Sequence, residues 1–410
     1  MNSDGPAAAV PFVRRVRVRG YRSIAGCDVA LGPLTVLLGF NASGKSNFLD
    51  VLRFVGDALR KSPTQAVADR GGLGALLHRS PRGVVDSFEI RLDLTLPPLS
   101  VHGEPVAAAY GFEIARDPEG ELPLVVRAEA AEIHLRDGVW RMPQDVGTGR
   151  GVARLRLSNT ALRETEPVAV LENLLRRMAF YELDSITLRE LEEPAGGQPQ
   201  LGRAGQQLGP VLGHIAAHDQ AGKERLDAYL AALVPNALGV DERREGRYST
   251  VQARFAAGEV GGAGDGGVEV FLRETMSEGT VLAAGVLAAL FQPAAFSGRI
   301  PLVAIEEPET ALHPAGVGAL YEALDDAAQR TQVIVTSQSS DLLDNEYAKL
   351  EHIRAVANVD GVTYVGEVDN AGRAMVEKEL MTISELHRSG QMMPVQVGHP
   401  ATERSAGGAR

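Results

Sequence analysis

The sequence predicts an α/β fold in which helices cover a parallel β-sheet, with an antiparallel β lobe beside it. Three observations support this fold class. An apolar strand at residues 34–38 precedes the glycine-rich run GFNASGKS, and an amphipathic helix follows it. Strands and helices alternate between residues 268 and 344, a spacing typical of parallel, helix-covered sheets. Apolar residues at every second position, as in residues 88–96, indicate a run of antiparallel strands over residues 86–158.

The run from Gly39 to Ser46 has the length and residue types of a phosphate-binding loop. Successive backbone N–H groups of such a turn, together with the N-terminus of the next helix, form a cradle for the β-phosphate of a nucleotide. Lys45 would reach the β and γ oxygens, and Ser46 would bind magnesium. The sequence therefore predicts a site for a nucleoside triphosphate.

The changes in periodicity divide the chain into four parts. These are an N-terminal half of the nucleotide-binding domain with the β lobe (10–165), a helical insert (166–245), a C-terminal half (246–390) and a disordered tail (391–410). Heptads are not sustained in the insert, so no long coiled coil is expected.

The expected elements follow in chain order. They are strands over 12–21, 27–38 and 152–157, a helix over 47–60, helical segments from 169 to 241, a strand over 268–272, a helix over 277–290, a strand over 302–305, a helix over 315–330, a strand over 332–336 and a short helix near 341.

Composition narrows the class of protein. With 410 residues and 44% hydrophobic content, the chain can bury a large core. The longest apolar run, Val281 to Phe291, is too short to cross a bilayer, and the N-terminus has no signal pattern, so we expect a cytoplasmic protein with no membrane partner. A single cysteine, Cys27, excludes an internal disulfide and a cysteine-rich zinc site.

The formal net charge of −12 argues against a surface that grips nucleic acid all over. A local basic strip is formed by Arg14, Arg15, Arg17, Arg19 and Arg22. Several of these arginines alternate with valines, as on a half-buried strand, so a solvated strand face is favoured over a DNA-binding strip.

A second acidic motif follows the strand over residues 302–305. Glu306 and Glu307 close this apolar strand, and the turn at Pro308 can bring both carboxylates to one site. Phosphoryl transfer needs a carboxylate that holds magnesium through water and another that orients or deprotonates the attacking water. We assign Glu306 to the metal and Glu307 to the water.

Four ordered motifs resemble the ABC-type ATPases of the RecF, SMC and OLD branch, and most closely the bacterial stand-alone "predicted ATPase" group associated with anti-phage defence. The motifs are GFNASGKSNFLDVLRF at 39–54, MSEGT at 276–280, AIEEPETALHP at 304–314 and VIVTSQSSDLLD at 333–344. The resemblance extends from about Val16 to Gly390. It implies an ABC-type P-loop fold that binds and hydrolyses ATP with Mg²⁺.

The resemblance also implies a composite site. The serine and glycine of MSEGT would close over the γ-phosphate held by a second copy, giving a head-to-tail homodimer with two sandwiched ATP molecules. A helix that begins at Ser277 is an anion site on physical grounds as well. The nucleotide-binding residues so implied are Arg22, Ser23, Asn41, Ala42, Ser43, Gly44, Lys45, Ser46, Asn47, Ser277 and Gly279, with Ser46 and Glu306 on the metal and Lys45, Glu307 and Gln338 as catalytic residues.

The sequence departs from the family at Gln338, where a histidine usually contacts the γ-phosphate. A glutamine amide still donates a hydrogen bond but gains no proton between about pH 5 and 8. We therefore expect slow turnover without a histidine-like inflection from this position. His313, beside the carboxylates, either substitutes for the missing histidine or only shapes the turn before Pro314.

Several functions compete once ATP binding is granted. A transporter subunit is disfavoured because the stretch between Ser46 and Ser277 is too long and MSEGT lacks the glutamine-ended signature, and a chromosome organiser would need long heptad arms. Only residues 358–410 follow the last family-like strands, too few for a nuclease domain. We expect an ATP-dependent switch, a dimer or a higher oligomer, that controls a separately encoded effector such as a nuclease. The alternative is a RecF-like repair ATPase that binds DNA directly.

Overall fold

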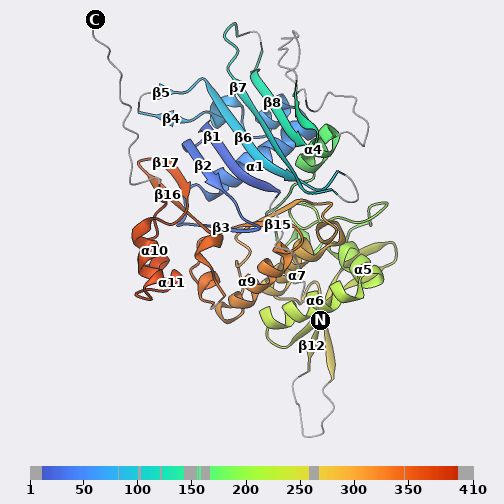
Figure 1. The fold of residues 1–410 in the computed structure, drawn as a ribbon. Helices are drawn as coiled ribbons and strands as arrows, with labels where there is room; N and C mark the ends of the chain where they lie inside the picture. The colour runs from blue at the N-terminus through green and yellow to red at the C-terminus, as the bar shows by residue number, and fades with distance from the viewer. Residues whose placement is uncertain are drawn as a thin grey trace, which may run out of the picture.

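The structure is a computed structural model that describes residues 12–395, except residues 82, 100–102, 121, 143–154, 156, 158–166, 258–266 and 346. Figure 1 shows an antiparallel sheet with helix α1 in the upper half, the core sheet below it, and a group of helices beneath the core sheet. Helices α10 and α11 flank the core sheet at one side. The α/β fold with a parallel, helix-covered core sheet is thus confirmed.

The elements have the following bounds. The strands are β1 (Val13–Tyr21), β2 (Ile24–Ala30), β3 (Leu34–Leu38), β4 (Arg79–Ser80), β5 (Gly83–Val84), β6 (Ser87–Leu96), β7 (Val106–Ala115), β8 (Val125–Leu135), β9 (Gly138–Arg141), β10 (Ala179–Tyr181), β11 (Ala237–Glu245), β12 (Tyr248–Ala256), β13 (Val268–Leu272), β14 (Leu302–Glu306), β15 (Gln332–Ser337), β16 (Ile353–Val359) and β17 (Val362–Gly366). The helices are α1 (Lys45–Arg60), α2 (Pro63–Ala68), α3 (Leu73–Leu76), α4 (Pro167–Arg176), α5 (Leu208–His218), α6 (Gln220–Leu233), α7 (Glu278–Phe291), α8 (Pro293–Phe296), α9 (Pro314–Ala328), α10 (Asn370–Glu377) and α11 (Ile383–Arg388), with short 3₁₀ turns at Thr187–Arg189, Asp341–Leu343 and Leu350–His352.

The antiparallel lobe is a six-stranded sheet in the order β2-β1-β6-β7-β8-β9. Strand β6 alternates between buried and less buried residues, as its sequence pattern predicts, and the buried face packs on α1 and α4. One expectation fails at this edge of the lobe. Of the strand expected over 152–157, residues 152–154 and 156 lie outside the described residues, and the buried residues Leu155 and Leu157 are not in a strand.

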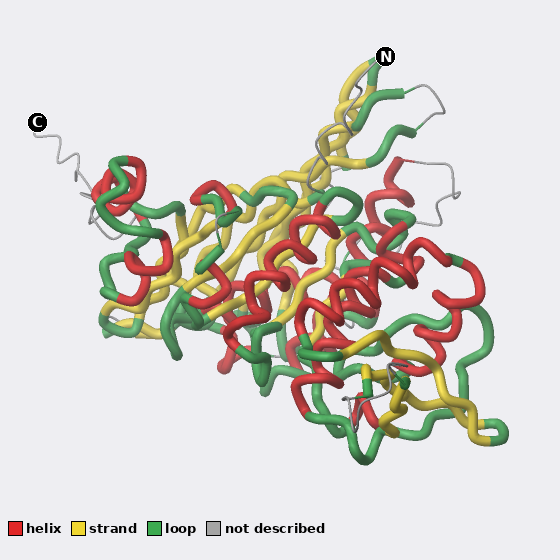
Figure 2. Tube along the Cα trace, turned by 90° about the horizontal axis from the view of Figure 1, so that it is seen from below, coloured by secondary structure: helices red, strands yellow, loops and turns green. Residues whose placement is uncertain are grey.

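The core sheet has the order β10-β14-β15-β3-β16-β17, and all its pairs are parallel except β16 with β17. Strand β3 is buried at every residue because both faces of the sheet are covered. Val36 faces the cluster formed with α5, α6, α7 and α9, whereas Leu37 faces the cluster formed with α1 and the antiparallel lobe. In Figure 2, seen from below, helices lie in front of the core strands.

The stretch expected to be helical from residue 169 to 241 is helical only in part. Helices α4, α5 and α6 form as predicted, but residues 182–207 contain only one 3₁₀ turn. Residues 237–245 form strand β11, and β10 adds an edge strand to the core sheet through pairing with β14. The tightly buried Ala237 and Val240 give β11 a packed face that a helical periodicity does not detect.

Strand β13 was expected to belong to the parallel sheet, and this expectation is wrong. It pairs antiparallel with β12 in a separate three-stranded sheet, in the order β11-β12-β13. The chain after β13 turns at Thr275 and Met276 into α7 rather than crossing over the core sheet. The expected elements over 302–344 are confirmed as β14, α9, β15 and a 3₁₀ turn.

The C-terminal residues 391–395 were expected to lie in a disordered tail, but they are attached. Pro394 bridges Val368, and Met392 is buried. Residues 396–410 lie outside the described residues.

One helical stretch, Glu278–Phe296 across α7 and α8, is long and apolar enough by length and composition to cross a membrane. However, 83% of the apolar window is buried inside the fold, as expected for a helix at the centre of a core. The longest helix among the described residues is α1, with 16 residues, so this part of the chain has no coiled-coil arm.

Candidate nucleotide-binding site

The predicted phosphate-binding loop lies between β3 and α1, at the C-terminal end of a central parallel strand. Gly44 is the N-cap of α1, with a left-handed φ of +104°. A Cβ at this position would lie 2.0 Å from Thr363 Oγ1, so the close approach of β17 requires glycine. Ala42 also has a positive φ, of 61°. The chain therefore turns sharply enough for N–H groups of the loop and of the helix N-terminus to converge.

Lys45 extends over this loop. Its Nζ donates to the carbonyl oxygens of Gly39 (2.7 Å) and Phe40 (3.1 Å). Burial lowers the pKa of Lys45, while the charges of Glu307, Glu309 and Glu306, at and after the end of β14, act to raise it. Since all three carboxylates act on one ammonium group, the acidic motif and the loop form one site.

Ser46 and Glu306 are brought together as the sequence predicts. The hydroxyl of Ser46 donates to Glu306 Oε2 at 2.7 Å, although 260 residues separate them. A hydroxyl and a carboxylate oxygen are hard ligands, which suit Mg²⁺ completed by phosphate oxygens and water. Within the described residues, no group of three or more His, Cys, Asp or Glu side chains is arranged to hold a metal by itself. The donor set fits magnesium bound jointly with a nucleotide.

Glu307 and Gln338 also meet. The Nε2 of Gln338 donates to Glu307 Oε2 at 3.1 Å. Glu307 adopts a left-handed φ of 44°, and its N–H is held by the carbonyl and hydroxyl oxygens of Thr336. A non-glycine residue in this conformation costs free energy and is common at functional sites. The turn directs Glu307 away from the strand direction and towards Gln338.

Sequence reasoning missed a third carboxylate, Glu309. It is 9% exposed, accepts a 2.5 Å hydrogen bond from Ser337 Oγ at the end of β15, and has an Oε2 without a partner. Burial raises the pKa of Glu309, and the hydrogen bond from Ser337 opposes this shift. The motif EEPE contained the signal, because a third acid two residues after Glu307 returns to the same turn.

Arg22, Ser23 and Asn47 form one network beside the loop. Arg22 donates to Asn47 Oδ1 at 3.2 Å, and Asn47 donates to Ser23 Oγ at 2.6 Å. Ser23 Oγ and Thr363 Oγ1 lie 2.8 Å apart, and Thr363 donates to the carbonyl of Ser43 at 3.0 Å. Hydrogen bonds thus connect Arg22, Ser23 and Asn47 to the phosphate-binding loop through Thr363. Asn41, also predicted as a binding residue, is exposed within the loop.

The predicted signature residues begin α7. Ser277 is the N-cap, and its hydroxyl accepts the N–H of Thr280 at 3.1 Å. A Cβ on Gly279 would lie 2.4 Å from the carbonyl oxygen of Ala311, so this glycine allows α7 to approach the segment after β14. Arg189, which the sequence did not single out, donates to the carbonyl of Met276 at 2.9 Å. His313 is exposed, and its carbonyl accepts the N–H of Gly316 in α9.

Buried polar atoms without a partner concentrate around these motifs. The five such atoms among the described residues are Arg22 Nε, Ser43 Oγ, Arg189 Nε, Glu309 Oε2 and His387 Nε2. Each belongs to the loop, to the acidic turn, or to a residue that contacts the loop or the signature residues. Buried polar groups normally have partners, so their collection at one place is consistent with a site for a polar ligand.

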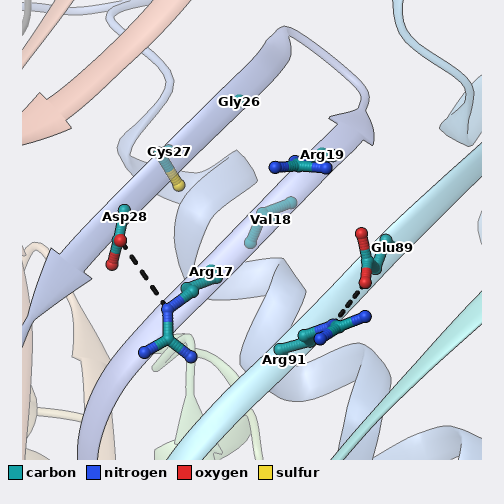
Figure 3. A pocket seen from close by; sticks show the side chains of 8 residues that line it. All are labelled: Arg17, Val18, Arg19, Gly26, Cys27, Asp28, Glu89 and Arg91. Atoms are coloured by element: carbon teal, nitrogen blue, oxygen red, sulfur yellow. Dashed lines mark hydrogen bonds and ion pairs between the residues drawn. The ribbon is translucent and has the colours of Figure 1, made fainter.

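The arginine strip of β1 is a solvated strand face. Figure 3 shows Arg17, Arg19 and Arg91 on the outer face of the antiparallel lobe with Asp28 and Glu89 among them. Arg17 pairs with Asp93 at 2.7 Å, and Arg15 pairs with Asp28 at 2.5 Å. Arg22 leaves the strip altogether and pairs with the buried Asp50. The charges of Arg15, Arg17 and Arg22 are therefore locally neutralised.

The fold is that of ABC-type P-loop domains. The fold is similar to that of two solved Smc head domains. One is an Smc head bound to the C-winged helix domain of ScpA, with 15% identity, a TM-score of 0.55, and coverage of 89% of this chain and 99% of that chain. The other is an Smc head with an extended coiled coil bound to the C-terminal domain of ScpA, derived from Pyrococcus furiosus, with 13% identity, a TM-score of 0.51, and coverage of 90% and 100%.

The chain belongs to the family described as "AAA domain, putative AbiEii toxin, Type IV TA system", whose match extends over residues 34–344, about three-quarters of the chain. This match includes the phosphate-binding loop, the signature residues and the acidic turn. No curated protein sequence matches the chain.

Proposed function

We propose that the protein binds and slowly hydrolyses ATP, and that it works as an ATP-dependent dimer switch. The observation that carries this proposal is the convergence of Lys45, Ser46 with Glu306, and Glu307 with Gln338 on one loop. A triphosphate with magnesium matches the chemistry of each group. ATP would be held by the cradle of N–H groups and by Lys45, with Arg22, Ser23 and Asn47 supporting the loop.

The residues have distinct roles in the proposed reaction. Ser46 and Glu306 would hold Mg²⁺, which neutralises charge on the β- and γ-phosphates. Glu307 would accept a proton from the attacking water. The oxygen of that water would bond to the γ-phosphorus, and the bond between the γ-phosphorus and the ADP oxygen would break. Gln338 would hold the Glu307 carboxylate and the water in place, because its amide donates and accepts hydrogen bonds but carries no titratable proton.

The proposed dimer is head-to-tail. Ser277 and Gly279 of one copy would close over the γ-phosphate bound by the other, so that ATP links the two copies and hydrolysis releases them. The support is the exposed position of Ser277 at the N-terminus of α7 and the resemblance in motif order. Arg189 at Met276 would keep this helix N-terminus in position.

The biological role that fits best is control of a separate effector in the cytoplasm, in bacterial anti-phage defence. The family description names an AbiEii toxin and a Type IV TA system, and the motif order resembles that of stand-alone ATPases associated with anti-phage defence. Direct DNA binding is less well supported because carboxylates pair with Arg15 and Arg17 of the β1 strip, and Arg22 pairs with the buried Asp50. A pull-down of the neighbouring gene product, with and without ATP, tests the effector role.

The catalytic assignment is tested with Glu307→Gln, which preserves size but removes the base. We expect its ATPase rate to fall by about 10² to 10⁴-fold and an ATP-dependent dimer to accumulate in light scattering after gel filtration. Lys45→Ala is the matched control, which should not retain ATP and should stay monomeric. Hydrolysis at the wild-type rate in Glu307→Gln would show that another group is the base.

A further inference from the structure

A residue of helix α11, near the C-terminal end of the described chain, contacts the phosphate-binding loop. We propose that His387 is a positioning residue of the ATP site, which acts through Phe40 to hold the first turn of the loop. This inference rests on the proposed ATP binding. It assigns a role to a segment that none of the sequence motifs includes.

The direct contact is between two rings. The His387 imidazole and the Phe40 ring are stacked, with centroids 5.0 Å apart and planes 23° from parallel. Phe40 is 56% exposed, whereas His387 is only 4% exposed. The imidazole is therefore the fixed partner, and it restrains an aromatic side chain that otherwise extends from the loop into solvent.

Phe40 is in turn connected to Lys45. Its carbonyl oxygen accepts one of the two hydrogen bonds from Lys45 Nζ and also the N–H of Ser43. A shift of the Phe40 backbone would therefore move both hydrogen bonds at once, and the stacked ring restrains such a shift. His387 is consequently placed to influence the affinity for the triphosphate without touching it.

The ring of His387 is held without a hydrogen bond at Nε2. This atom is buried and has no partner among the described residues. Burial lowers the pKa of His387, and the positive charges of Lys45 and Arg388 lower it further. The neutral ring favoured at neutral pH does not repel the Lys45 ammonium group, so ring stacking is the interaction left to position Phe40.

Helix α11 is itself fixed to the segment that follows Gln338. Arg388 donates to Ser340 Oγ (2.8 Å), Asp341 Oδ1 (3.0 Å) and Asp344 Oδ2 (3.4 Å). Thr382 and Glu385 form a capping box at the N-terminus of the helix. The helix therefore contacts both the phosphate-binding loop and the chain beyond the catalytic glutamine.

The test compares variants of the full chain by titration with a fluorescent ATP analogue and Mg²⁺. His387→Ala removes the stack, and we expect it to weaken binding by about threefold to tenfold, the range for an aromatic pair. His387→Phe keeps a stacking ring without ring nitrogens, so its affinity should stay within about twofold of the wild type.

Phe40→Leu breaks the same stack from an exposed position, where folding is not at risk, and should reproduce the loss in His387→Ala. An affinity within about twofold of wild type in both of these variants, or a loss in His387→Phe as large as in His387→Ala, would overturn the inference. The wild type should bind the analogue saturably, and Lys45→Ala should abolish this binding. If either result is not obtained, the proposed ATP binding fails and this inference fails with it. If the wild type binds the analogue and His387→Ala and Phe40→Leu bind it equally well, only the role of His387 is refuted and the proposed ATP binding stands.

Discussion

Asp50 is the buried anchor beneath the nucleotide site, and replacing it with asparagine tests how strongly the site depends on one carboxylate. Asp50 accepts from Tyr21 at 2.7 Å and pairs with Arg22 (3.0 Å), Arg53 (2.6 Å) and Arg70 (2.9 Å). Asp50→Asn keeps the shape but removes a counter-charge from three guanidinium groups, of which Arg70 keeps its second pair, with Asp57 at 2.9 Å. The effect should be far larger than for a surface pair.

The magnitude follows from the exposure of the partners. Removing one member of a buried ion pair costs about 3–5 kcal/mol. The side chains of Asp50 and Arg70 are 2% and 5% exposed, but Arg53 (20%) and Arg22 (29%) are reached by water, which weakens their share. We therefore expect a loss of about 3 kcal/mol in the free energy of unfolding, at the lower end of the range.

The pH dependence provides a second readout. Burial acts to raise the pKa of Asp50, but the charges of Arg70, Arg53 and Arg22 outweigh burial, so the pKa lies below its ordinary value. A carboxyl with a depressed folded-state pKa stabilises the fold fully above its unfolded pKa of about 3.9, and this contribution is lost as pH falls towards the folded-state value. Asp50→Asn should lack this part of the acid sensitivity.

The assay is urea denaturation monitored by circular dichroism, at neutral pH and at stepped pH values below about 4.5. Asp28→Asn is the control, because its partners Arg15 and Arg17 are both exposed and such pairs should contribute less than about 1 kcal/mol each. A neutral-pH loss for Asp50→Asn no larger than for Asp28→Asn would refute the reasoning. A loss in both stability and ATP affinity would instead connect this anchor with Arg22 and the loop.

Three further outcomes are expected. Lys45→Ala should abolish ATP retention in a filter-binding assay, because each charge-assisted hydrogen bond contributes about 1.5–3 kcal/mol. The ATPase rate of the wild type should show no pH-dependent limb near neutrality that arises from Gln338, because its amide does not titrate there. A limb near neutrality that is present in the wild type and absent in Gln338→Ala would contradict the role assigned to Gln338. Gly279→Ala, introduced into the Glu307→Gln protein, should weaken its ATP-dependent dimer but leave binding of the ATP analogue within about twofold. The reason is that the new Cβ would meet the Ala311 carbonyl and not the phosphate-binding loop. An equal loss of dimer formation and of analogue binding would argue against a separate role for the MSEGT residues.

The sequence predicted correctly those features that depend on residues adjacent in the chain. The strand, glycine turn and helix around Lys45 follow from period and residue type, and the acidic turn follows from two carboxylates after an apolar strand. It was not informative for contacts over long separations. Nothing near His387 indicates that it stacks on Phe40, and nothing near Asp50 shows that Arg70 will be its partner. Strand β13 was misassigned because pattern reveals a strand but not the sheet that it joins.

The position of β3 in the core sheet has a consequence for synthesis of the protein. This strand pairs with β15 on one side and β16 on the other, and Thr363 closes the loop through the carbonyl of Ser43, 320 residues earlier in the chain. Pairing across such separations is slow to form. The loop is translated early, but strands β15, β16 and β17, which enclose it, are translated much later. A prematurely terminated chain would therefore contain the whole GFNASGKS run and still be unable to retain ATP, so that incomplete copies of this ATPase would be silent rather than constitutively active.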